Sequence, residues 1–141
     1  MDLAIRQALL STCRIRVGAV LVAGSRVLAV GTNLRRNCPS IDFRHATFHA
    51  EETVLRKVRS APRNSSVFVA RVNRAGSPLL ARPCPRCQMA LAAAGVGRAY
   101  YTTNEQTVES LDIPTSMSNI HALVGATRRG CVTGAGVSRS Q

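Results

Sequence analysis

The segment VGAVLVAGSRVLAVGTN, residues 17–33, constrains the fold of this chain more than any other stretch. Two runs rich in Val, Leu and Ala flank the turn-forming pair Gly24 and Ser25, a pattern that predicts a β-hairpin. Both runs are nearly continuous in apolar residues, which is typical of strands that helices cover on both faces. The hairpin therefore predicts an α/β fold in which a sheet lies between helices.

The chain on both sides of the hairpin predicts helices. Helical spacing of apolar residues indicates one helix within residues 1–13 and a second from about residue 48 to residue 59. Thr47 is available as the N-cap of the second helix. Residues 34–47, between the hairpin and this helix, contain Pro, Asn, Asp and three arginines and should form a long loop. Long ordered loops in compact domains are usually functional.

The second half of the chain predicts a crossover connection. Three elements follow one another, namely the strand SSVFVARV, the short helix CPRCQMALAAAG that Gly95 ends, and the strand GRAYYTT. Because a helix joins them, the two strands can lie parallel through a right-handed crossover. The later segment TVESLDIP is either a helix or a short fifth strand, and residues from about 135 to 141 should fray.

This order of elements, α-β-β-α-β-α-β, predicts a three-layer α-β-α sandwich around one mixed five-stranded sheet. The length of 141 residues suits a single domain, residues 1–141, and 45% hydrophobic residues exclude a disordered chain. No apolar run approaches the roughly 20 residues of a membrane span, so we expect neither a membrane partner nor a signal peptide.

Charge and cysteine content narrow the partner and the compartment. The formal net charge of +12 favours a phosphate-bearing partner, either a nucleotide or a single-stranded nucleic acid. An alternative remains open, because 18 arginines against the single lysine Lys57 can simply reflect genomic base composition. Five cysteines are an odd number and include a Cys-x-x-Cys pair, which favours metal binding in a reducing compartment and predicts a cytoplasmic protein.

One imidazole and two thiols form a candidate metal site. His49, Cys84 and Cys87 supply a ligand set suited to tetrahedral Zn²⁺ with one position left open. The two cysteines lie three residues apart at the start of a predicted helix, where exposed amides and the helix dipole favour thiolates. Cys38, in the long loop, is an alternative fourth ligand that would close the site.

Glu51 distinguishes a reactive site from a structural one. A structural zinc site has no need of a glutamate two residues from its histidine, whereas a hydrolytic site needs a proton carrier beside the metal. Glu52 has a simpler interpretation, because the helix dipole alone favours an acidic residue in a first turn.

The two motifs together resemble the signature of zinc-dependent nucleobase deaminases, H-x-E followed by P-C-x-x-C. Here HAEETVL precedes PCPRCQMAL by 27 residues, and the resemblance to the CMP/dCMP-type, cytidine deaminase-like family covers about residues 17–103. It implies that His49, Cys84 and Cys87 bind zinc and that Glu51 is the general acid and base. It also implies a hydrogen bond from the Cys84 backbone amide to the attacking water or the departing ammonia.

Further substrate contacts follow from the same resemblance and from position in the chain. Asn33 matches a position where an asparagine binds the sugar, although it also suits a turn. Arg35 and Arg36 lie in the loop that follows, where guanidinium groups can hold phosphate or simply face solvent. Of the adjacent Tyr100 and Tyr101, one should face the core and the other can stack on a base, and we assign the stacking contact to Tyr101.

The resemblance implies a hydrolytic enzyme that converts cytosine to uracil. The substrate is either a dCMP-like nucleotide or single-stranded nucleic acid. Two alternatives remain, namely an adenosine-to-inosine deaminase acting on RNA and a non-catalytic zinc-stabilised binding module. Members of this family commonly assemble, so we also expect a homo-oligomer.

Overall fold

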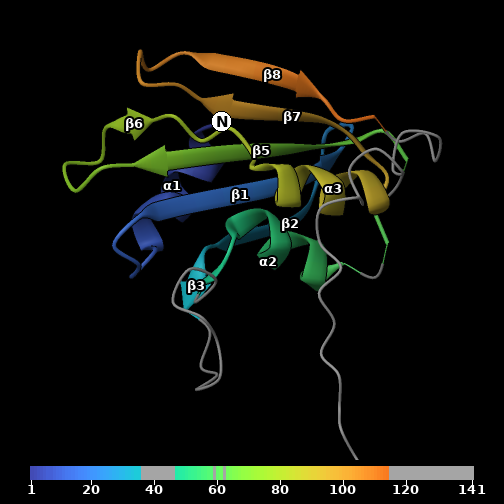
Figure 1. The fold of residues 1–141 in the computed structure, drawn as a ribbon, viewed down its shortest axis with the longest axis horizontal. Coiled ribbons are helices and arrows are strands. Elements are labelled where there is room, and N and C mark those ends of the chain that lie inside the picture. The colour runs from blue at the N-terminus through green and yellow to red at the C-terminus, as the bar shows by residue number, and fades with distance from the viewer. Residues whose placement is uncertain (36–46, 59, 62, 115–141) are drawn as a thin grey trace, which may run out of the picture.

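The computed structural model describes residues 1–35, 47–58, 60–61 and 63–114, which form a sheet between helices (Figure 1). The main strands lie side by side in the order β2 (Arg26–Thr32), β1 (Arg16–Ala23), β5 (Ser65–Val72), β7 (Val96–Thr102) and β8 (Val108–Asp112). The pair β5 and β7 is parallel, and the other neighbours are antiparallel. The predicted mixed sheet is therefore confirmed with five main strands, to which a short sixth strand is added, and the segment after residue 107 is a strand.

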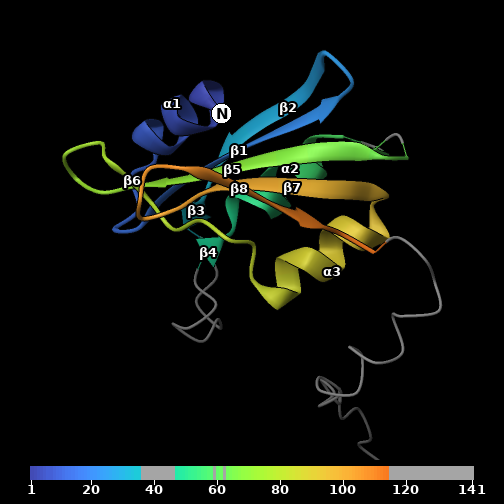
Figure 2. The same ribbon diagram turned by 90° about the horizontal axis from the view of Figure 1, so that it is seen from above.

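Helices cover both faces of this sheet (Figure 2). α1 (Asp2–Leu10) lies on one face, and α2 (Ala50–Lys57) and α3 (Pro85–Ala93) lie on the other. α3 connects the parallel strands, and Gly95 follows it with φ of 87°, the left-handed conformation that glycine adopts without strain. The three-layer sandwich is confirmed. No helix in the described ranges is both long and apolar enough to cross a membrane.

Short pairings modify the sheet and the long loop. β6 (Pro78–Leu79) pairs with the end of β5, and β3 (Leu34–Arg35) pairs with β4 (Thr47–Phe48). The two ends of the predicted 34–47 loop are thus held together as a small ribbon, while residues 36–46 lie outside the described residues. The fraying predicted for residues 135–141 also lies outside them.

The predicted N-cap of α2 was wrong by two residues. The cap is His49, whose backbone amide donates a hydrogen bond of 3.0 Å to Glu52 Oε2 in a capping box. Thr47 instead belongs to β4, where it pairs with Arg35. The glutamate three residues after His49 and the strand pairing of Thr47 together move the helix start towards the C-terminus.

Alternating side chains of the central strands divide the core into two clusters. Ala19, Leu21, Val67 and Val69 face α2 and α3 in the larger cluster. Val20 and Ala70 face α1 with Ala4 in the smaller cluster. The same strands therefore support both helical layers, as expected for strands with apolar residues on both faces.

Candidate active site

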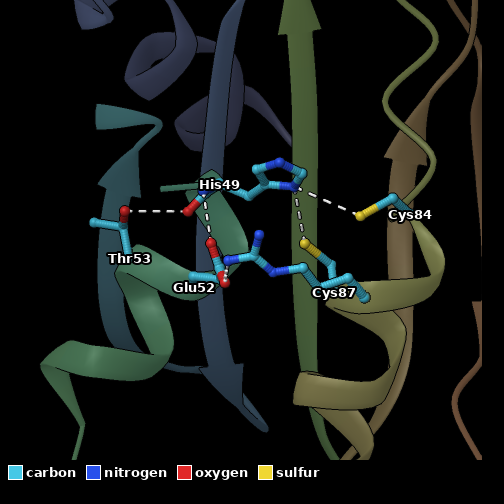
Figure 3. A network of polar contacts seen from close by, with 6 residues as sticks. His49, Glu52, Thr53, Cys84 and Cys87 are labelled. Atoms are coloured by element: carbon cyan, nitrogen blue, oxygen red, sulfur yellow. Dashed lines mark hydrogen bonds and ion pairs between the residues drawn. The ribbon is translucent and has the colours of Figure 1, made fainter. Parts of the chain in front are cut away.

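The candidate metal ligands lie at the starts of two helices that face the same point. His49 is the N-cap of α2 and Cys84 is the N-cap of α3. Pro85 begins α3, where its fixed φ suits a first helical residue and its missing N–H leaves no hydrogen bond unmade. The next turn brings Cys87 back beside Cys84, so the helix start presents both thiols to the His49 ring (Figure 3).

Distances at this point fit a tetrahedral ion. His49 Nδ1 lies 3.2 Å from Cys87 Sγ and 3.6 Å from Cys84 Sγ, and the three ligand atoms lie within 4.8 Å of one another. Zinc with bonds of about 2.0 Å to nitrogen and about 2.3 Å to sulfur would separate such atoms by about 3.6 Å. The predicted cluster is therefore assembled in the described structure without a large rearrangement.

The chemistry of the donors also calls for a cation. Cys87 is fully buried, and its burial, together with the nearby Glu51 and Cys84, raises the pKa of its thiol far above the usual range. The protein alone thus opposes the thiolate, although thiolate is the form that binds metals. A dipositive ion at this point would supply the missing positive charge, so the residues present fit Zn²⁺.

Glu51 lies in the first turn of α2 and is only 5% exposed. Burial raises the pKa of its carboxyl group, and its own backbone amide and His49 partly oppose this effect. A carboxyl group with a raised pKa beside a metal cluster is typical of a functional site.

Glu52 does more than the helix dipole requires. Besides capping the His49 amide, its carboxylate forms an ion pair with Arg86 of α3. Burial alone would raise the pKa of Glu52, but hydrogen bonds from His49 and Arg86 outweigh it and lower the pKa. The predicted role of Glu52 as a dipole partner alone therefore missed its contact with the cysteine-bearing helix.

A cavity of about 260 Å³ opens beside the cluster. Its floor is formed by the sheet, and its walls come from the start of α2, the segment before α3 and the end of β2. The lining residues are Ile15, Val17, Asn33, Thr47, His49, Ala50, Glu51, Val69, Arg71, Leu80, Ala81, Arg82 and Cys84. The cavity thus brings two of the three candidate ligands, His49 and Cys84, together with the buried carboxyl group and two arginines.

Asn33 lines this cavity and also organises the chain around it. Its Oδ1 accepts hydrogen bonds from Ser11 Oγ at 2.6 Å and from the Val17 amide at 3.0 Å, and its Nδ2 donates to the Ile15 carbonyl at 2.7 Å. An asparagine amide carries two N–H donors, so these contacts use one and leave the second for a ligand. The turn role and the substrate role predicted for Asn33 are therefore compatible.

The other predicted contacts are placed differently. Arg35 is exposed in β3, and Arg36 lies outside the described residues. Tyr101 is only 4% exposed in the larger core cluster, where its hydroxyl donates to Glu109 Oε2 at 2.8 Å. The lining of the described cavity does not include Tyr101. Its base contact stays a prediction.

Sequence reasoning missed Arg71 as a cavity residue. Arg71 follows Val67 and Val69 at every second position of β5, so all three point to the face that carries α2 and α3. This alternation is visible in the segment SSVFVARV. A charged residue at an inward position of a buried strand was the available signal.

Comparison with known proteins identifies the family. The cytidine and deoxycytidylate deaminase zinc-binding region matches residues 1–103. The chain belongs to this deaminase family. The chain is thus a zinc-dependent hydrolytic deaminase, and the predicted enzyme class and zinc cofactor are confirmed. The binding-module alternative gives way to this class.

Solved structures of similar proteins support the same family and fold. The apo dCMP deaminase of cyanophage S-TIM5 is 28% identical with a TM-score of 0.55, and the match covers 72% of this chain and 78% of that chain. The same enzyme in complex with dCMP and dUMP is 27% identical with a TM-score of 0.55, covering 72% of this chain and 76% of that chain. A comparison with curated protein sequences finds no match. The cytidine deaminase-like fold is therefore established from solved structures.

Proposed function

We propose that this deaminase converts cytosine to uracil in a dCMP-like nucleotide. His49, Cys84 and Cys87 would hold the zinc ion, and Glu51 would move the protons. The observation that carries this proposal is the position of Glu51, which is buried and lines the same cavity as His49 and Cys84. A metal site that only stabilises a fold has no use for a buried carboxyl group facing a cavity.

The reaction exchanges the amino group at C4 of cytosine for oxygen. The oxygen of a water molecule bonds to C4, the C4–N bond breaks, and ammonia leaves. Bound Zn²⁺ would lower the pKa of water to about 7 and so supply the nucleophile. Glu51 would accept one proton from the water and pass it to the ring nitrogen, and would then take the second proton from the oxygen added at C4 and pass it to the leaving amino group. The Cys84 amide donates a hydrogen bond to the water or the departing ammonia.

Charge in the cavity supports a substrate that carries phosphate. Arg71 and Arg82 both line the cavity, and guanidinium groups bind phosphate oxygens in pairs. The remaining N–H donor of Asn33 is available to a sugar hydroxyl. Arg35, Arg36 and Tyr101 remain predicted contacts around this arrangement. The dCMP and dUMP bound to the cyanophage deaminase are consistent with a nucleotide of this kind.

A polynucleotide is the second candidate substrate, and the mouth of the cavity favours it. Ile15 and Leu80 line the cavity and are 53% and 45% exposed, and Leu34, which follows the lining residue Asn33 in the chain, is 48% exposed. Apolar surfaces beside arginines suit the bases and phosphates that flank a target base in a single strand. An adenosine in RNA falls within this second candidate.

One assay distinguishes these substrates. Zinc-loaded protein is incubated separately with dCMP, CMP and single-stranded DNA and RNA oligonucleotides that contain cytosine and adenine, and the nucleosides are analysed by mass. We expect uracil product from dCMP and none with Glu51→Gln. Product from oligonucleotides alone would replace the nucleotide proposal with the polynucleotide one. Inosine as the only product would replace cytosine with adenine.

Assembly and location remain expectations. We expect a homo-oligomer, which light scattering of purified protein would reveal as a mass above that of one 15.1 kDa chain. We also expect a cytoplasmic protein, because the proposed ligands need reduced thiols.

A further inference from the structure

The carboxylate of Glu52 contacts both elements that carry the candidate metal ligands. Its Oε2 accepts the 3.0 Å hydrogen bond from the His49 backbone amide in α2. Its Oε1 accepts from Arg86 Nη2, and Arg86 lies between Cys84 and Cys87 in the first turn of α3. A single side chain therefore links the backbone of the histidine with the helix turn of the two cysteines (Figure 3).

We propose that Glu52 and Arg86 form a clamp that positions the zinc ligands before the metal binds. This inference rests on the proposed ligand set of His49, Cys84 and Cys87. Glu52 and Arg86 are positioning residues in this role, because neither of them lines the described cavity, whereas Glu51 does. The clamp fixes the separation of the two helix starts, which decides whether the imidazole and the thiols can reach one ion.

The two helix starts are not joined directly by the chain. The starts of α2 and α3 are 35 residues apart in sequence, and the whole strand β5 lies between them along the chain. Their relative position therefore has to be set by contacts across space. Binding sites that are held in the productive geometry lose less free energy on ordering when the ligand arrives.

The surroundings of the clamp make it stronger than an ordinary surface ion pair. The side chains of Glu52 and Arg86 are 17% and 40% exposed, and the carboxylate is also bonded to a backbone amide. Another ion pair among the described residues, between Arg98 and Asp112, is 51% and 80% exposed and joins the neighbouring strands β7 and β8. Screening by water leaves exposed pairs of this kind with little effect. Asp112 therefore offers a matched control.

The test compares zinc release and cobalt spectra of five variants with the wild type. Zinc loss to a chromophoric chelator is timed for Glu52→Ala, Glu52→Gln, Arg86→Ala, Arg86→Lys and the control Asp112→Ala. We expect Glu52→Ala and Arg86→Ala to release zinc about 10 to 100 times faster, the range typical of residues that orient metal ligands. The visible bands of the Co²⁺-substituted protein should weaken or shift in both, and Asp112→Ala should match the wild type.

The conservative variants separate positioning from helix stability. Glutamine can still accept the hydrogen bond from the His49 amide, so Glu52→Gln should keep the melting temperature of the metal-free protein while releasing zinc faster. Arg86→Lys keeps the charge and loses the planar donor group, so it should release zinc at an intermediate rate. The double variant Glu52→Ala/Arg86→Ala should be no worse than the more severe single variant, since both remove one interaction.

Two outcomes would overturn the clamp. Wild-type zinc release and cobalt spectra in both alanine variants would show that the ligands need no such link. Lower melting temperatures with unchanged spectra would reduce Glu52 to a helix cap. Cys87→Ala separates this failure from failure of the proposed function. If Cys87→Ala binds zinc as the wild type does, the proposed ligand set is wrong. If Cys87→Ala loses zinc while the clamp variants keep it, the ligand set stands and only the clamp is wrong.

Discussion

The two faces of the sheet use the same strands for different purposes. On the α1 face, Gly18 of β1 lies so close to the helix that an added Cβ atom would come within 2.3 Å of Ala4 O and Ala8 N. On the other face, the helices α2 and α3 begin at the edge of a 260 Å³ cavity. The backbone of α1 packs directly against β1, whereas α2 and α3 leave space for a ligand at their N-terminal ends.

This difference indicates that the α1 face contributes mainly to stability, whereas the face with α2 and α3 carries the candidate active site. Small residues such as Ala4, Ala8 and Ala70 let α1 approach the sheet without a gap. The opposite face also has a dense core, but that core ends where His49 and Cys84 begin their helices. Substitutions on the two faces should therefore separate loss of folding from loss of activity.

The largest effect should come from Glu51→Gln on the cavity face. The change keeps the shape of the side chain and removes proton transfer, so deamination of dCMP should fall by about 10³-fold or more. The free energy of unfolding should not fall, because a buried carboxyl group is costly to keep. Steady-state rates, zinc content and thermal melting measure these quantities.

Glu105→Gln provides the control for this variant, since Glu105 is exposed in the turn between β7 and β8. It should retain the wild-type rate. Near-normal turnover in Glu51→Gln would contradict the assigned role, and loss of zinc together with activity would indicate a role in the metal site instead.

The next largest effect should come from Gly18→Ala on the α1 face. The new methyl group would meet backbone atoms of α1, which cannot move aside without shifting the helix. We expect the free energy of unfolding to fall by about 3 kcal/mol. Urea denaturation measures it, and the folded fraction should still bind zinc.

Gly31→Ala makes the same change towards α2 and sharpens the comparison. There the added methyl group would lie 2.9 Å from Thr53 Cγ2, a side-chain atom that can shift. The loss of stability should be smaller than for Gly18→Ala. An equal or larger loss would mean that α2 is held as rigidly as α1.

The fold could be predicted because its signals are local and repeat along the chain. The apolar runs around Gly24, the strand SSVFVARV and the glycine after α3 each predict an element from neighbouring residues alone. The segment TVESLDIP stayed ambiguous, because five residues of β8 satisfy no helical or strand pattern strongly. Its pairing with β7 decides its structure.

The site was predictable only in its two motifs. His49, Glu51 and the cysteines follow a spacing that specifies their chemistry, and the structure brings the three ligand residues together. The link from Glu52 to Arg86 spans 34 positions and has no sequence pattern. Likewise, Ser11 as a partner of Asn33 depends on how the end of α1 meets the end of β2. Contacts of this kind follow from packing, which a sequence does not display.

Asn33→Ala should have an intermediate effect on stability and should also affect substrate binding, because Asn33 contacts the chain after α1 and also lines the cavity. It removes the partner of Ser11 after α1 and of two backbone groups at the cavity, and leaves buried polar atoms unpaired. We expect the free energy of unfolding to fall by about 2 kcal/mol and KM for dCMP to rise. Ser11→Ala removes one of these bonds and should lower stability less, with KM unchanged. An unchanged KM in Asn33→Ala would restrict Asn33 to its turn role.

The smallest effect should be the coupling between the stacked rings of Phe68 and Tyr100. Their centroids lie 4.8 Å apart with 13° between their planes. Phe68 packs against the smaller cluster, so this pair belongs to the α1 face, whereas the adjacent Tyr101 belongs to the cavity side. Alanine variants of Phe68 and Tyr100, singly and together, should give a coupling of about 1 kcal/mol in the free energy of unfolding. The rate of deamination should not change in any of them, because neither ring lines the described cavity. A rate that falls with Tyr100→Ala would show that the α1 face also shapes the active site, and the separation of the two faces would then fail.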